Sequence, residues 1–301
     1  MARTADDNWD VAGKVGSTAL ATAVVRAAES LREDRLFADP FAQRFIDAAV
    51  AAGWRNPHGT DAWHANDYED PAVAQFREVS TNGAACRTRF IDDFLGTGAE
   101  RQVVLLAAGL DARAWRLPWP AGVTVYELDQ PGVLAFKADV MAGEEPGAGL
   151  RAVPVDLRHD WPHALVAAGF DATAPTVWVA EGLMPYLPPD GQDQLFERID
   201  TYSAAGSRLV ADVYPPEFYE PEKTRAMFAQ MNATARADVY SGEELFFPAG
   251  QRAEADEWLS ERGWTTSTET ATEVMTALGR RPPAGVPVGT TNFRYLTAQC
   301  G

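Results

Sequence analysis

The pattern of apolar and polar positions changes near Arg101, where a helical part of the chain gives way to an alternating part. Upstream of this point, residues 18–32 are rich in alanine and carry apolar side chains at helical spacing. Asp39-Pro40 and Asp70-Pro71 each place a capping residue directly before a proline, which is a signal for the start of a helix. The sequence therefore predicts three helices before Arg101, at residues 18–32, 40–52 and 72–94.

From Arg101 onward, short apolar segments alternate with helical ones. Strands that are apolar throughout and separated by helices are typical of a parallel sheet covered on both faces. The expected fold class is therefore α/β, with a mostly parallel Rossmann-like sheet and helices on both of its faces. Strands are predicted at 102–108, 124–129, 151–157, 176–180, 209–213, 264–270 and 292–298, and helices at 131–141, 161–168, 189–202 and 253–262.

After Tyr214 the alternation stops until about residue 250. Aromatic and methionine side chains are frequent in this segment, and such side chains suit an adaptable apolar wall beside a ligand. The alternative is that they only pack the segment onto the sheet. They are Phe218, Tyr219, Met227, Phe228, Met231, Tyr240, Phe246 and Phe247.

The organisation of the chain follows from these two changes of pattern. We expect a helical N-terminal cap at 1–100, an α/β core at 101–214, a lid insertion at 215–250, and a C-terminal completion of the core sheet at 251–301. All four parts are expected to form one structural domain. A loop rich in proline and glycine at 282–289 is expected to join the last two strands.

Composition narrows the range of partners. The net charge of −17 argues against a nucleic-acid partner, because phosphate binding needs clustered lysine and arginine. No run of about 18 apolar residues is present, so we expect no contact with a membrane. The two cysteines, Cys86 and Cys300, have no metal-type spacing, so a reduced, cytoplasmic setting is expected and no metal site is predicted.

The predicted strand ends carry the candidate chemistry. Ligands of open α/β sheets bind beyond the carboxyl ends of the strands. Four successive strands end in or beside a carboxylate, which indicates a cradle for a polar ligand. Taken singly, each acid is more often a helix cap or a turn residue. The residues at these ends are Gly109 and Asp111, Asp129, Asp156 and Leu157, and Glu181.

These residues fit S-adenosylmethionine better than a dinucleotide. A pyrophosphate requires little negative charge beside a glycine-rich turn, and Asp111 is expected to repel it. S-adenosylmethionine has no phosphate and carries a sulfonium and an ammonium. Asp129 lies 20 residues after Gly109, which is the usual separation for an acid that accepts the ribose hydroxyls. A nicotinamide-dependent oxidoreductase and a non-catalytic cofactor-binding module remain the alternatives.

The segments at these strand ends resemble, in order, the motifs of the leucine carboxyl methyltransferase family. The resemblance covers roughly residues 15 to 214, and Ser17-Thr18-Ala19 and Asp39-Pro40-Phe41-Ala42 are similar to the bacterial branch. Each motif alone is unspecific, whereas the ordered set is highly specific. The motifs are Arg87-Thr88-Arg89, Gly109-Leu110-Asp111-Ala112-Arg113, Glu127-Leu128-Asp129-Gln130-Pro131 with Lys137, Val155-Asp156-Leu157, and Ala180-Glu181-Gly182.

The resemblance implies a class I methyltransferase with a seven-stranded sheet, a helical N-terminal lid, an insertion after the fifth strand, and S-adenosyl-L-methionine as cofactor. It also implies roles for six residues. Arg89 is expected to bind the carboxylate of the methionine moiety, the Gly109 loop to pass beside the cofactor, Asp129 to bind the ribose, Asp156 and Leu157 to contact the adenine, and Glu181 to bind the methionine end.

One position of the chain departs from the family pattern. The methyl acceptor is not assigned by the sequence. Ala107 stands where the family has the first glycine of its loop, so its methyl group is expected either to crowd the cofactor or to shift the loop. By analogy with the family we expect O-methylation of a carboxylate or of a small-molecule hydroxyl. A carboxylate needs no general base, whereas a hydroxyl does. Tyr186 and Tyr214 follow the fourth and fifth strands, but a packing role is at least as plausible for each, so the catalytic residues stay unknown.

Overall fold

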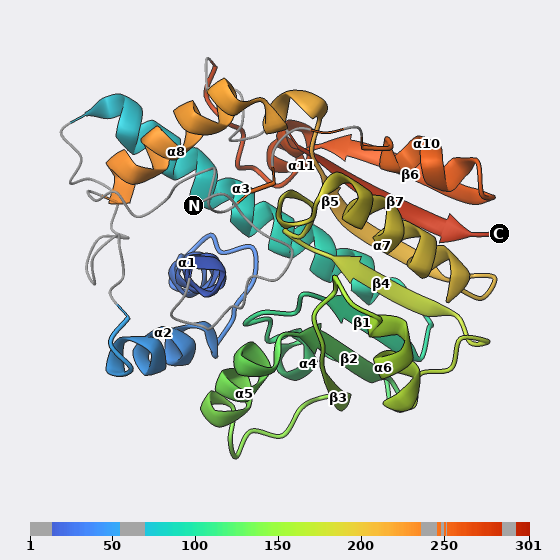
Figure 1. The fold of residues 1–301 in the computed structure, drawn as a ribbon. Coiled ribbons are helices and arrows are strands. Elements are labelled where there is room, and N and C mark those ends of the chain that lie inside the picture. The colour runs from blue at the N-terminus through green and yellow to red at the C-terminus, as the bar shows by residue number, and fades with distance from the viewer. Residues whose placement is uncertain (1–13, 55–69, 236–245, 248–249, 251, 285–292) are drawn as a thin grey trace. The chain divides into compact units, whose positions relative to one another are not determined.

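The structure is a computed structural model that describes residues 14–54, 70–235, 246–247, 250, 252–284 and 293–301 (Figure 1). The strands are β1 (Gln102–Leu106), β2 (Thr124–Asp129), β3 (Gly149–Pro154), β4 (Thr176–Ala180), β5 (Arg208–Val213), β6 (Trp264–Thr270) and β7 (Arg294–Cys300). The helices are α1 (Lys14–Ser30), α2 (Ala42–Ala51), α3 (Pro71–Gly96), α4 (Arg113–Arg116), α5 (Pro131–Val140), α6 (Trp161–Ala167), α7 (Pro189–Thr201), α8 (Pro221–Ala235), α10 (Ala255–Ser260) and α11 (Ala271–Ala277), with 3-10 turns η1 (Met184–Tyr186) and η2 (Pro216–Tyr219). None of the described helices combines the length and the apolar character that crossing a membrane requires.

The chain forms two compact units whose segments interleave along the sequence. The first unit takes its described residues from 1–90, 214–249 and 270–293. The second takes them from 91–213, 250–269 and 294–301. Most of the predicted N-terminal cap and most of the predicted insertion are therefore assigned to the same unit, whereas residues 91–100 of the predicted cap are assigned to the second unit. Whether these segments close over a ligand stays a prediction.

The second unit is built on a seven-stranded sheet with the order β3-β2-β1-β4-β5-β7-β6. β1 pairs in parallel with β2 and β4, and β7 runs antiparallel to β5. Every residue of β1 and β4 is buried, as the uniformly apolar pattern predicts for central strands. Helices lie on both faces of this sheet, with α6 beside β2, α5 beside β3 and α10 beside β7 (Figure 1). The predicted α/β class and mostly parallel sheet are confirmed.

Four predicted strands have different limits in the structure. The first was expected at 102–108 but ends at Leu106, and the fifth was expected at 209–213 but begins at Arg208. The third was expected at 151–157, but the ladder with β2 ends at the pair Asp129 and Pro154, so Asp156 lies in the following turn. The last was expected at 292–298, but β7 covers Arg294–Cys300. The third strand was expected to run further because Val155 and Leu157 continue its apolar pattern, whereas only the neighbouring strand decides where pairing stops.

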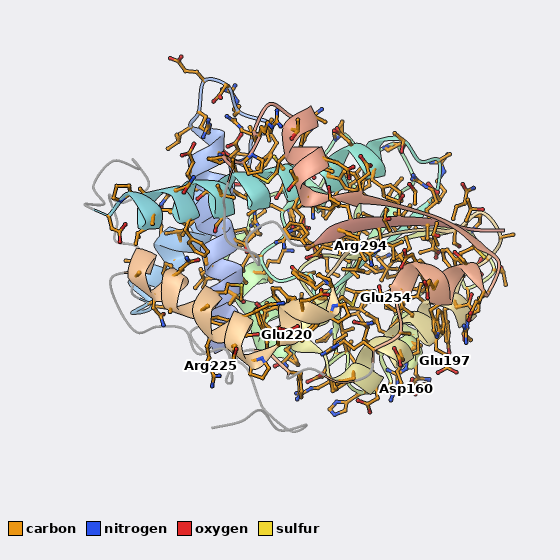
Figure 2. All side chains as sticks on the ribbon, turned by 90° about the horizontal axis from the view of Figure 1, so that it is seen from above. Asp160, Glu197, Glu220, Arg225, Glu254 and Arg294 are labelled. Carbon is orange, nitrogen blue, oxygen red and sulfur yellow. The ribbon has the colours of Figure 1, made fainter. Side chains whose placement is uncertain are left out.

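The C-terminal segments are attached to the second unit by polar contacts as well as by strand pairing. At the start of β7, Arg294 forms an ion pair of 2.8 Å with Glu254, the residue that precedes α10 (Figure 2). At the start of β6, Trp264 Nε1 donates to Asp200 of α7 at 2.7 Å. These contacts explain how residues far from the central strands complete the sheet.

A short helix between the last two strands was not predicted. α11 begins after Thr270 with a capping box, in which the Thr270 side chain accepts from Glu273 N and the Glu273 side chain accepts from Thr270 N. This arrangement satisfies two backbone donors that a helix start leaves without partners. The predicted loop at 282–289 begins after this helix, and its residues 285–289 lie outside the described residues.

In the first unit, Asp39 organises the start of α2. Its Oδ1 accepts from the backbone N–H of Phe41 and of Ala42 at 3.0 and 3.1 Å. Its Oδ2 forms a buried ion pair of 2.8 Å with Arg26 of α1. The helix therefore starts at Ala42, two residues later than predicted, although Asp39 still caps its first turn.

The aromatic side chains of the predicted insertion pack against one another in the first unit. The ring centroids of Tyr214 and Phe218 are 4.4 Å apart, and those of Phe228 and Phe246 are 5.1 Å apart. Phe218 and Phe246 join the two pairs at 5.5 Å. Mutual packing accounts for these four rings, while Tyr240 lies outside the described residues.

Cys86 lies on the part of α3 that belongs to the first unit and is fully buried, as expected of a small apolar residue. Burial raises the pKa of its thiol to about 12. The thiol therefore stays protonated at neutral pH and is not a nucleophile.

Candidate functional site

The loop after β1 turns through two left-handed residues. Ala107 has φ 55° and Gly109 has φ 50°, and among the described residues Ala107 is the only residue other than glycine with a positive φ. The loop is held to β2 because Ala108 N donates to Leu128 O at 2.9 Å. Gly109 N then donates to Asp129 Oδ2 at 2.7 Å. The structure thus brings together the glycine and the acid that the 20-residue spacing associates.

The Asp129 carboxylate is fixed by the backbone on both of its oxygens. Besides the bond from Gly109, its Oδ1 accepts from Gln130 N at 2.7 Å. Within the part of the chain that the structure describes, Asp129 forms no ion pair, and burial raises its pKa above the ordinary value. A carboxylate oxygen has capacity for a second hydrogen bond. Asp129 can therefore accept two neighbouring hydroxyl groups without moving.

Arg113 is the residue that the sequence reasoning missed. It lies at the start of α4, it is only 2% exposed, and it connects three carboxylates. Its Nε donates to Asp92 at 2.7 Å, and its Nη1 donates to Asp111 at 2.5 Å and to Glu181 at 2.7 Å. Arg116 adds two bonds to Asp92, at 2.6 and 2.7 Å. The sequence did contain a signal for Arg113, because this residue is part of the family motif that follows β1.

This network corrects the expected role of Asp111. Burial alone would raise the pKa of Asp111, but the charges of Arg113, Lys137 and Arg116, together with the hydrogen bond from Arg113 N, outweigh it and lower the pKa to about 2. Asp111 is therefore ionised and paired with Arg113, and it does not present an uncompensated charge to a ligand. The charge of Asp111 therefore does not exclude a phosphate, and the choice of cofactor depends on the other residues.

A second buried ion pair lies behind the same strand ends. Glu127 of β2 accepts from Lys137 of α5 at 2.7 Å, and both side chains are 2% exposed. Lys137 Nζ also lies 5.4 Å from the centroid of the Trp115 ring. Glu127 is thus occupied by Lys137, which leaves Asp129 as the carboxylate of β2 that is open to a ligand.

Asp156 and Leu157 lie in the turn after β3. The Asp156 carboxylate forms an ion pair of 2.5 Å with Arg158 and accepts from Gln130 Nε2 at 3.2 Å. Burial raises the pKa of Asp156, but the hydrogen bonds and the charge of Arg158 outweigh it and lower the pKa. A ligand amino group that bonds to Asp156 must therefore exchange with Arg158 or Gln130. Leu157 is half-buried beside it.

Four of the predicted sites lie in the second unit, at the ends of strands that are neighbours in the sheet. β1 and β4 are adjacent and their connections lead to opposite sides, which is the switch point where such sheets bind ligands. Arg89 belongs instead to the first unit, where its Nη1 donates to Leu36 O at 2.8 Å. Its contact with a cofactor stays a prediction. The four sites of the second unit are the Gly109 loop, Asp129, the Asp156-Leu157 turn and Glu181.

Replacing Ala107 by glycine is expected to stabilise the protein. A left-handed conformation costs an L-residue roughly 1–2 kcal/mol, whereas glycine adopts it freely and loses about 0.5–1 kcal/mol of chain entropy. Ala107→Gly should therefore raise the free energy of unfolding by about 0.5–1 kcal/mol in urea titrations, with no loss of cofactor affinity. The matched control is Ala112→Gly, at φ −110° in the same loop, which should be destabilising. Equal destabilisation by both variants would show that Ala107 is not strained.

The comparison with known families agrees with this geometry. The family model described as leucine carboxyl methyltransferase matches residues 19–200. This chain belongs to the leucine carboxyl methyltransferase family. The enzyme class that the sequence predicted, an S-adenosylmethionine-dependent methyltransferase, is confirmed by that membership and by the curated relatives. The sheet is the class I methyltransferase arrangement that the resemblance implied.

Relatives of this leucine carboxyl methyltransferase family member span its whole length. Two proteins of Mycobacterium avium (strain 104), each named "Putative S-adenosyl-L-methionine-dependent methyltransferase", are 44% and 47% identical to it. The alignments cover 99% of this chain in both cases, and 99% and 98% of the relatives. Among solved structures, a "putative methyltransferase" from Thermobifida fusca YX is 18% identical, with a TM-score of 0.49, over 85% of this chain and 93% of that one.

Proposed function

We propose that this protein transfers the methyl group of S-adenosyl-L-methionine to an oxygen atom of a small acceptor, either a carboxylate or a hydroxyl. Asp129 is the single observation that carries the proposal. Its two carboxylate oxygens are held by backbone N–H groups at the end of β2 and have no ion-pair partner among the described residues. This is the arrangement that a ribose diol requires, at the position where a class I sheet binds its cofactor.

The other strand ends fit the same cofactor. In the ion pairs described for the Arg113 network, three carboxylates share two guanidiniums, so these five groups carry one more negative than positive charge. An excess of negative charge suits a ligand that carries a sulfonium and an ammonium. When bound, S-adenosylmethionine supplies a methyl group on a sulfonium that is activated for displacement.

The residues of this chain contribute mainly by binding and orientation. We assign the ribose to Asp129, the methionine end to Glu181, the adenine to Asp156 and Leu157, and the cofactor carboxylate to Arg89. Methyl transfer is an in-line displacement, so holding two reactants in one geometry supplies much of the rate acceleration. An acceptor carboxylate is ionised at neutral pH and needs no base. We therefore favour the carboxylate acceptor, because its methylation does not require any described residue to act as a base.

Binding of the demethylated cofactor tests the proposal directly. S-adenosylhomocysteine should bind with measurable heat in titration calorimetry, and at 100-fold above its Kd it should stabilise the fold by about 2.7 kcal/mol. NADH is the control, because the structure pairs Asp111 with Arg113 and so no longer excludes a dinucleotide by charge. If millimolar S-adenosylhomocysteine gave neither heat nor a shift in Tm, or if NADH bound instead, the proposed function would be wrong.

A further inference from the structure

Glu181 follows β4 at the switch point of the sheet, and its carboxylate is held from the side of β1. Its Oε2 accepts from Arg113 Nη1 at 2.7 Å, and the same Nη1 bonds to Asp111 of the loop after β1. The Glu181 side chain is 17% exposed, so it lies at the surface of the site while Arg113 lies beneath it. Arg113 thus sets the direction of the carboxylate relative to the loop after β1.

The backbone next to Glu181 is held from the opposite side, by β5. Ala180 of β4 is paired with Ala211 of β5, so the next residues along the two strands, Glu181 and Asp212, lie at the same level. Asp212 Oδ1 accepts from Gly182 N at 2.5 Å. Gly182 has φ 60°, a conformation in which the chain turns sharply directly after Glu181.

Asp212 is unusual for its position. It is fully buried in β5, whose residues Leu209, Val210 and Ala211 are also fully buried and apolar. A carboxylate in such a strand is costly unless it has hydrogen-bond donors, so its presence requires a compensating role. The bond to Gly182 N supplies that role, because it fixes the turn that presents Glu181.

We infer that Asp212 and Arg113 are positioning residues that hold Glu181 from both ends, so that its carboxylate meets the amino-acid end of the cofactor. Asp212 fixes the backbone at the Glu181-Gly182 turn, and Arg113 fixes the carboxylate. Neither residue needs to touch the cofactor. Fixing a binding group before the ligand arrives raises affinity, because less order has to be imposed on binding. This inference rests on the proposed function, in which Glu181 binds the methionine end.

The test compares two ligands that differ only in that end. S-adenosylhomocysteine carries the amino-acid moiety, and 5′-methylthioadenosine lacks it. Glu181→Gln should weaken S-adenosylhomocysteine binding about tenfold or more while leaving 5′-methylthioadenosine binding nearly unchanged, since a hydrogen bond to a charged group is lost. Asp212→Val should reproduce this selective loss, and Asp212→Asn, which keeps an oxygen acceptor for Gly182 N, should restore most of it.

The double variant Asp212→Val with Glu181→Gln completes a cycle. If Asp212 acts through Glu181, the second substitution should add little to the loss caused by the first. The inference would be overturned if Asp212→Val and Asp212→Asn each weakened the binding of both ligands to the same extent. It would also be overturned if the losses of binding free energy from the two single substitutions added fully in the double variant. A wild-type protein that binds neither ligand would instead overturn the proposed function. Each variant's Tm is measured, and if Asp212→Val is unfolded at the assay temperature, Asp212→Ala takes its place in the comparison and in the cycle.

Discussion

Lys137→Met is expected to lower the free energy of unfolding by about 3–5 kcal/mol, which is the usual cost of removing one partner from a buried ion pair. Glu127 and Lys137 are each 2% exposed and lie 2.7 Å apart, so the variant leaves a carboxylate in the core without its cation. The lost contact of Lys137 with the Trp115 ring adds to the effect. Urea titrations at neutral pH measure the change.

The pH dependence of the stability of Lys137→Met distinguishes an unpaired Glu127 carboxylate from a simple packing defect. Burial raises the pKa of Glu127, and without Lys137 the pKa should rise further. The folded variant then binds more protons than the unfolded chain, so its stability increases as the pH falls. The deficit of Lys137→Met should therefore shrink at about pH 5 relative to neutral pH. The control, Glu127→Leu with Lys137→Met, should be near wild type at both pH values. A deficit that does not change with pH would refute the charge explanation.

Asp129→Ala is expected to weaken S-adenosylhomocysteine binding by at least a hundredfold. Two hydrogen bonds from a ribose to a charged carboxylate contribute roughly 1.5–3 kcal/mol each. Folding should change much less, because burial already disfavours the charged form of Asp129, as the raised pKa shows. Calorimetric titration gives the affinity, and urea titration gives the stability of the same preparation.

Asp129→Asn is the matched variant for this prediction. It keeps one oxygen for a ribose hydroxyl and the bond from Gly109 or Gln130, so its affinity should lie between those of the wild type and the alanine variant. If Asp129→Ala bound S-adenosylhomocysteine normally, Asp129 would be only the anchor of the loop after β1, and the ribose would have to bind elsewhere.

The regular part of the fold was predictable because its signals are local. The strands at 124–129, 176–180 and 264–270 have the predicted limits, since each apolar or alternating segment ends at a residue that changes the pattern. α11 was missed although its capping box is visible in the sequence, because seven residues are too few for an apolar period to emerge. The strand-end acids were also found, since the order of the strands alone brings them to one edge.

The electrostatics of the site were not predictable in the same way. Arg113 is identifiable in the sequence only as part of the motif after β1, and its partners Asp92, Asp111 and Glu181 come from three separate stretches of sequence. Only the fold decides which carboxylate is paired with which guanidinium. Both Asp111 and Asp129 were expected to be unpaired, whereas the structure pairs Asp111 with Arg113 and gives Asp129 only backbone donors among the described residues.

The position of β7 has a consequence for synthesis on the ribosome. β5 and β7 are neighbours in the sheet, with Val213 paired to Arg294, but residues 214–293 intervene and are largely assigned to the other unit. A nascent chain that has completed β5 must therefore present an unpaired strand edge until the whole interval and β7 have emerged. Exposed edges of this kind recruit other strands. Slow translation of residues 214–293 should therefore increase the exposure of this protein to chaperones and to aggregation.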